Sequence, residues 1–192
     1  MLPRPSIDHE IAKRPYWNTS LQCHQGAELS SATFSATKTA GLITRMQMGD
    51  GGTAVYDRGF YNIGVRPTGD DVGVGGTDAF GNPLSVSRRE QLNPGSVPGA
   101  GVTVAADERV AVDGAFMMQS LRNVELTAPY FHDGSAATLA EVVRFYVKGG
   151  NENPNRDWQL EPVPLTEIEQ RDVVEFLKAL TSDDARRVVE AR

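Results

Sequence analysis

Two stretches in the last third of the chain carry the hydrophobic period of amphipathic helices. The first begins with the capping-box pair Thr138 and Glu141 and ends at the glycine pair 149–150. Its apolar residues recur at the i, i+3, i+4 and i+7 positions of one helix face: Leu139, Val142, Val143 and Tyr146. The pattern predicts a helix in this stretch, with Tyr146 on its buried face.

The second stretch repeats the same pattern. Thr166 and Glu169 form its capping box, and the helix is predicted to end near Thr181. Its apolar stripe is Ile168, Val173, Val174, Leu177 and Leu180. The turn-rich segment 151–164 connects the two helices, and the second helix is expected to close the fold.

The rest of the chain has weaker patterns. Residues 30–48 are rich in Ser, Thr and Ala and predict an irregular loop that leads into a short helix around 42–48. Residues 49–113 are dense in Gly and Pro and show no helical period, which predicts a long wrapped loop. The polar, proline-broken residues 1–18 predict a flexible arm, residues 19–184 one domain, and residues 185–192 a frayed tail.

Composition narrows the function classes. The chain has 192 residues, enough to bury a core, and a net charge of −6, which disfavours nucleic acid and anionic membranes as partners. No apolar run is long enough for a membrane span, and residues 1–16 lack the apolar run of a signal peptide. One cysteine excludes an internal disulfide.

That cysteine lies in the segment Ser20-Leu21-Gln22-Cys23-His24, which is a CxxCH haem attachment motif without its first cysteine. In the full motif two thiols bind the porphyrin and the histidine ligates iron. The segment therefore keeps one thiol and the iron ligand. A bare Cys-His pair also fits a small buried cysteine without a cofactor.

Other chemistries have less support. The three histidines, His9, His24 and His132, lie too far apart in the sequence to argue for a zinc site. Cys23 has no flanking pattern typical of a cysteine hydrolase. The glycines at 73, 75 and 76 lack the strand and helix that a phosphate-binding loop requires, so they indicate a turn.

Three further segments carry a family resemblance: FYNIGV at 60–65, LRNV at 121–124 and TAPYFHDG at 127–134. Together with Cys23-His24, they resemble the C-terminal half of the bacterial di-haem cytochrome c peroxidase family. That family includes the enzyme that matures the tryptophan tryptophylquinone cofactor of methylamine dehydrogenase. The resemblance extends over roughly residues 23–181.

The resemblance implies a mainly α, cytochrome c-like domain with long irregular loops that holds one haem c. Cys23 would be its covalent anchor, by a single thioether, and His24 the proximal iron ligand. The distal ligand is methionine in peroxidases of the family and tyrosine in the quinone-maturing branch, and here the position corresponds to Tyr146. A buried tyrosine that only packs in a core is the alternative. A tyrosinate would stabilise ferric iron and lower the reduction potential.

By the same resemblance, the backbone carbonyls of Thr127 and Pro129 would be ligands of a calcium ion, a metal that prefers oxygen ligands. Arg122 and His132 would lie beside the haem propionates. No residue is assigned a catalytic role, because the family places peroxide chemistry on the N-terminal haem.

The chain departs from the family in having one Cys-His motif and about half the expected length. We therefore expect a second haem domain or subunit as a partner, a small electron-donor protein, and hydrogen peroxide or a protein as substrate. Haem c attachment outside the cytoplasm implies a periplasmic protein whose leader has been removed. The predicted function is an oxidoreductase domain that carries electrons for peroxide reduction or protein oxidation. The alternatives are a haem-free structural or interaction domain, motivated by Ser20, and a mono-haem electron carrier.

Overall fold

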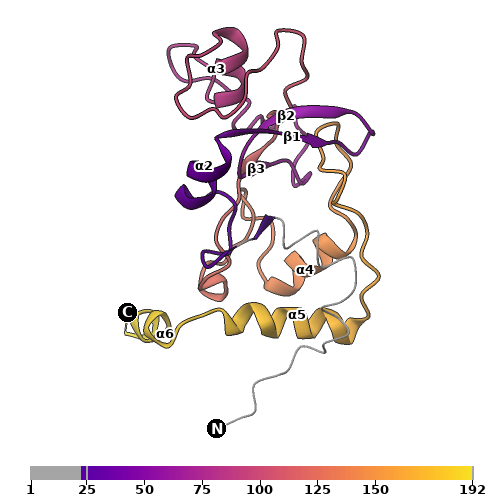
Figure 1. Ribbon diagram of the computed structural model, residues 1–192. Coiled ribbons are helices and arrows are strands. Elements are labelled where there is room, and N and C mark those ends of the chain that lie inside the picture. Colours follow the sequence, from indigo (N-terminus) through magenta and orange to yellow (C-terminus); the bar gives the residue numbers. More distant parts are fainter. Residues whose placement is uncertain (1–22, 25, 192) are drawn as a thin grey trace. The chain divides into compact units, whose positions relative to one another are not determined.

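The computed structural model describes residues 23–24 and 26–191, which form two compact units (Figure 1). Unit 1 combines the described residues up to Leu29, Ser120–Gly149 and the described residues from Glu161 onward, and unit 2 combines Ser30–Gln119 and Gly150–Leu160. The predicted arm at 1–18, and Ser20 with it, lie outside the described residues. None of the described helices is both long and apolar enough to cross a membrane.

Unit 2 is organised around a β-hairpin. Strand β1 (Ile43–Gln47) pairs antiparallel with β2 (Thr53–Asp57), with Ile43 opposite Asp57 and Gln47 opposite Thr53. The short helix predicted around 42–48 is therefore wrong. A five-residue stretch is too short to distinguish the helical period from the alternation of a strand. The glycine-rich turn between the two strands joins them as a hairpin.

The core of unit 2 is closed by segments that follow the hairpin. Ile43 and Val55 pack with Ala100 and Val104, and all four are nearly inaccessible. A second cluster contains Met48, Ala54 and Ala111. A second small sheet pairs β3 (Phe60–Tyr61) with β4 (Phe116–Met117), and helix α2 (Phe34–Ala40) precedes the hairpin.

The glycine-rich stretch is not one continuous loop, because helix α3 (Val86–Leu92) lies within it. The buried carboxylate of Asp57 accepts hydrogen bonds from the Ser85 hydroxyl and from the backbone N–H groups of Val86 and Ser87, at 2.8–2.9 Å. These are the N–H groups that a helix start leaves without partners. A residue 28 positions earlier thus helps to cap α3, which local sequence could not indicate.

Unit 1 contains the two predicted helices, and their predicted starts are confirmed. Helix α4 (Leu139–Val147) and helix α5 (Glu167–Ala179) both begin with complete capping boxes, and they pack against each other. Unit 1 also holds the 3₁₀ helix η1 (Val124–Leu126) and helix α6 (Asp183–Glu190). Helix α6 occupies most of the segment predicted to be a frayed tail.

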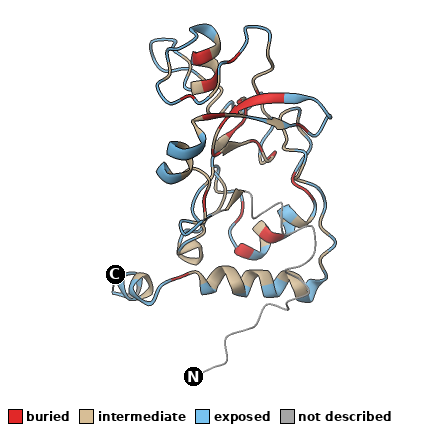
Figure 2. Cartoon of the chain, in the orientation of Figure 1, coloured by how far each residue is buried: buried red, intermediate tan, exposed pale blue. Residues whose placement is uncertain are grey.

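Burial in unit 1 is less complete than the helical pattern predicted. Leu139 and Val143 of α4 are buried, but 39% of the Tyr146 surface is exposed, so its placement on the buried face needs correction. Helix α5 buries none of its residues, as Figure 2 shows by the absence of red along it. The expectation of a mainly α fold describes unit 1, whereas unit 2 mixes small sheets with short helices.

Candidate functional site

His24 is held in a form that can ligate a metal. Its Nδ1 lies 2.9 Å from the carbonyl oxygen of Leu29. Because a carbonyl can only accept, Nδ1 carries the proton and the Nε2 lone pair of the neutral ring stays available. Desolvation by burial lowers the pKa of His24, although the bond to Leu29 opposes the shift. The ring is therefore neutral at neutral pH, as an iron ligand must be.

Cys23 and Tyr146 belong to the same electrostatic environment in unit 1. Desolvation raises the pKa of the Tyr146 hydroxyl, and the charge that Cys23 would carry as a thiolate raises it further. The hydroxyl lies among many protein atoms even though part of the residue remains accessible. The structure thus brings the predicted anchor and the predicted distal ligand, which are 123 positions apart in the sequence, into one region.

Aromatic contacts orient the C-terminal end of α4. The rings of Phe145 and Tyr146 meet edge to face with centroids 5.7 Å apart, and Phe131 packs on Phe145 at 4.8 Å. Phe131 lies within the TAPYFHDG segment, so this segment contacts the helix that carries Tyr146. Such pairs add a modest directional stabilisation to apolar burial.

The TAPYFHDG segment forms an exposed turn closed by a bridge between Tyr130 and Ala136. Thr127 and Pro129 are exposed, and neither carbonyl accepts a hydrogen bond from a described residue. Across the described ranges, no group of three or more His, Cys, Asp or Glu side chains could hold a metal ion.

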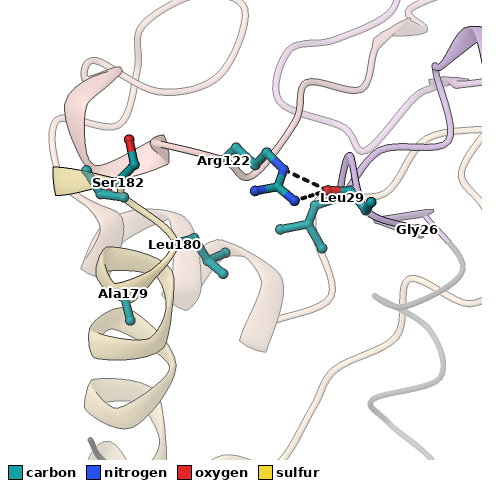
Figure 3. Close-up of a pocket in the computed structure, with 8 residues that line it drawn as sticks. Gly26, Leu29, Arg122, Ala179, Leu180 and Ser182 are labelled. Carbon is teal, nitrogen blue, oxygen red and sulfur yellow. Dashed lines mark hydrogen bonds between the residues drawn. The ribbon is translucent and has the colours of Figure 1, made fainter. Parts of the chain in front are cut away.

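Arg122 and His132, the two residues predicted to lie beside the haem propionates, lie in different places within unit 1. His132 is exposed on the same turn. Arg122 lines a cavity of about 390 Å³ in unit 1, shown in Figure 3, whose lining residues are Gly26, Ala27, Leu29, Arg122, Ala179, Leu180, Thr181 and Ser182. The predicted ligands Cys23, His24 and Tyr146 do not line this cavity, so their grouping and the cavity are separate features.

The residues present fit a haem by the chemistry of their side chains. A thiol, a neutral imidazole with a free Nε2 and a desolvated phenol form one donor set in unit 1. The apolar stripe of α5 is also left partly accessible, as expected of a surface that receives an apolar group.

Sequence reasoning missed the residues around His24. Leu29, whose carbonyl orients the imidazole, carries no motif. FYNIGV had no assigned role, but its Asn62 is buried in unit 2 and bonds to Thr68, to the Asp113 carbonyl and to the N–H of Gly64. Asn62 therefore organises a loop rather than a cofactor contact.

Comparison with known proteins identifies partial relatives. Cytochrome-c peroxidase IdrP1 of Denitromonas iodatirespirans is 48% identical over 68 residues, which are 35% of this chain and 18% of that protein. Methylamine utilization protein MauG of Methylorubrum extorquens is 38% identical over 71 residues, or 37% of this chain and 20% of MauG. Cytochrome c551 peroxidase of Nitrosomonas europaea is 43% identical over 68 residues, or 35% of this chain and 17% of the peroxidase. No family model matches the chain.

A solved structure shares the fold over nearly the whole chain. The crystal structure of a MauG-like protein associated with microbial copper homeostasis matches with a TM-score of 0.53 and 24% sequence identity. The match covers 95% of this chain and 49% of that one. The chain thus spans about half of this neighbour and aligns with no more than about a fifth of each curated relative named above.

Proposed function

We propose that this chain, a relative of the di-haem cytochrome c peroxidases and of MauG, is a c-type haem domain of a peroxidase-family oxidoreductase. It would carry electrons for the reduction of hydrogen peroxide or for the oxidation of a protein substrate. The observation that carries this proposal is the hydrogen bond from His24 Nδ1 to the Leu29 carbonyl, which leaves Nε2 free to ligate iron.

In this proposal, Cys23 anchors one haem c by a single thioether, His24 is the proximal ligand and Tyr146 the distal ligand. When bound, the haem supplies a one-electron couple at iron. Tyr146 must lose its proton to ligate, and the desolvation that raises its pKa works against this loss. Ligation by Tyr146 should therefore weaken as the pH falls.

The surrounding residues would complete the site. The carbonyls of Thr127 and Pro129, both exposed residues, would bind a calcium ion with oxygen ligands from elsewhere. Arg122 and His132 would interact with the haem propionates. Both residues are exposed and belong to unit 1, which also holds His24.

The chain matches about half of the MauG-like neighbour, so the proposal includes partners for the remaining functions. A second haem domain or subunit would supply the peroxide-reacting haem, and a small protein would donate electrons. A periplasmic location follows from haem c attachment. Two alternatives remain: a haem-free structural or interaction domain, favoured by the serine at position 20, and a mono-haem electron carrier.

Haem attachment tests the proposal directly. The chain should be expressed in the periplasm with a haem c maturation system, then examined by haem staining of a denaturing gel and by its pyridine haemochrome spectrum. We expect covalent haem with an absorption band displaced from that of ordinary haem c, because only one vinyl group is saturated. Ser20→Cys should restore the ordinary band, and Cys23→Ala should abolish staining. Absence of covalent haem in the unmodified chain would refute the proposal.

The distal ligand has its own test. Tyr146→Phe should change the ferric absorption and electron paramagnetic resonance spectra of the haem-loaded chain. Tyr130→Phe is the matched control, because Tyr130 is a half-buried tyrosine of unit 1 without an assigned ligand role. Identical ferric spectra for Tyr146→Phe and the unmodified chain would exclude Tyr146 as a ligand.

A further inference from the structure

The loop that follows His24 is held by a segment more than ninety residues later in the sequence. The Arg122 side chain donates from Nε to the Ala27 carbonyl at 2.6 Å, and its Nη2 donates to the same oxygen. The Ser120 hydroxyl donates to the Glu28 carbonyl, also at 2.6 Å. Figure 3 shows the Arg122 side chain pointing toward the loop that carries Gly26 and Leu29.

The third contact reaches the oxygen that orients His24. The N–H of Leu121 donates to the Leu29 carbonyl at 3.4 Å, and that carbonyl also accepts from His24 Nδ1 at 2.9 Å. Three consecutive carbonyls, at positions 27, 28 and 29, thus meet donors from three consecutive residues, at positions 120, 121 and 122.

From these contacts we infer that residues 120–122 act as a clamp that positions His24 through the backbone of loop 26–29. The inference rests on the proposed role of His24 as the proximal ligand and adds Ser120 and Arg122 as positioning residues. Neither touches the imidazole. Both hold the loop backbone at Ala27 and Glu28, which leads to the Leu29 carbonyl that fixes the tautomer and the orientation of the ring.

The exposure of the clamp residues indicates that their hydrogen bonds position the loop rather than stabilise the fold. Ala27, Glu28, Ser120 and Arg122 are all exposed, so water would satisfy these carbonyls if the clamp were absent. Hydrogen bonds that water can replace contribute little to folding free energy. Their value here is geometric, because they hold the loop in which Leu29 has a φ of 50°, a left-handed conformation that is uncommon for a residue with a side chain.

A ligand histidine is tuned by the bond at its other nitrogen. Donation from Nδ1 to a carbonyl fixes which nitrogen ligates and makes the ring more electron-rich. A displaced Leu29 carbonyl would weaken that bond and leave the ring free to rotate. The clamp would therefore influence the reduction potential as well as the geometry of the site.

The first test uses the full chain without haem, labelled with ¹⁵N-histidine and studied by NMR at about pH 8, where His24 is neutral. His24→Gln assigns its signals. The unmodified chain should show the Nδ1-protonated tautomer with a slowly exchanging proton. Ser120→Ala/Arg122→Ala should make exchange about tenfold faster, which corresponds to the loss of one hydrogen bond.

The matched control is Arg58→Ala. Arg58 makes the same kind of contact in unit 2, where Nε donates to the Gly41 carbonyl and Nη2 to the Ala40 carbonyl, both at 2.8 Å. Its removal should leave the His24 signals unchanged. If the double variant does not fold, Arg122→Lys, which retains the charge but not the forked donors, should give an intermediate exchange rate.

The second test measures the midpoint potential of the haem-loaded chain. Ser120→Ala, which removes a clamp contact without changing the charge beside the haem, should shift it to a more positive value than in the unmodified chain and in Arg58→Ala. An unchanged tautomer and exchange rate in the double variant would overturn the clamp even if haem binds. Absence of haem from the unmodified chain would refute the proposed function instead, and the exchange data would still decide on the clamp.

Discussion

Units 1 and 2 differ in how they bury their apolar side chains. Unit 2 closes its own core, in which Ile43, Met48, Val55 and Val104 have at most 1% of their surface exposed. Unit 1 holds every predicted haem ligand, but its longest helix, α5, buries no residue. The difference indicates that protein side chains fill the core of unit 2, whereas the apolar faces of unit 1 are suited to packing on a further apolar body.

The largest expected contrast comes from the same substitution in both units. Ile43→Ala should reduce the free energy of unfolding by about 2–5 kcal/mol, because it leaves a cavity in the core of unit 2. Ile168→Ala, at a position with 63% of its surface exposed, should cost less than about 0.5 kcal/mol in the haem-free chain. Urea unfolding followed by circular dichroism measures both. Equal losses would show that α5 has a protein core that its exposure does not indicate.

The stability of unit 2 should also depend on pH in the alkaline range, through the buried Tyr56. Burial raises the pKa of Tyr56 in unit 2, and the charge of the neighbouring Tyr61 adds to the shift. Tyrosine in the unfolded chain titrates near pH 10. Above that pH the folded state therefore holds more protons than the unfolded state, and stability falls as the pH rises. The contribution of Tyr56 is complete below about pH 10 and is lost progressively above it.

Tyr56→Phe tests this dependence. At neutral pH the variant should lose about 1 kcal/mol, because the hydrogen bond between Tyr56 and Tyr61 is removed. The deficit should shrink as the pH rises above about 10, since phenylalanine does not titrate. Urea midpoints measured between neutral and alkaline pH check the trend. A deficit that stays constant with pH would mean that the Tyr56 hydroxyl ionises as readily in the fold as in the unfolded chain.

The sequence predicted features that depend on neighbouring residues and missed those that depend on distant ones. The capping boxes of α4 and α5 lie within four residues, and both starts were located correctly. Helix α3 receives hydrogen bonds at its start from Asp57, and β1 is defined by its pairing with β2, so neither could be identified locally. The same holds for the site. Cys23 and His24 form a readable motif, whereas the contact of Arg122 with loop 26–29 spans 95 positions.

Tyr146 shows where a local pattern is informative but incomplete. Helical spacing placed it on the same face as Val143, which is buried. On that face Val143 is covered by other residues, but 39% of the Tyr146 surface stays accessible. Helical spacing gives the direction of a side chain and not whether another part of the chain covers it. The electrostatic link between Tyr146 and Cys23 depends on the folded chain and has no signal in the helical pattern; only the family resemblance grouped the two residues.

The smallest expected contrast concerns the two capping boxes. Thr138 and Thr166 make the same contact, accepting from the N–H of Glu141 and Glu169 at 3.3 Å. Either substitution by alanine should cost about 1 kcal/mol of helix stability, and serine should restore most of it because it keeps the hydroxyl. Thr138 precedes the buried Leu139, whereas α5 buries nothing. Fraying at Thr138 therefore also releases apolar contacts, so Thr138→Ala should lower the unfolding midpoint more than Thr166→Ala. The opposite order would indicate that α5 contributes more to unit 1 than its exposed surface implies.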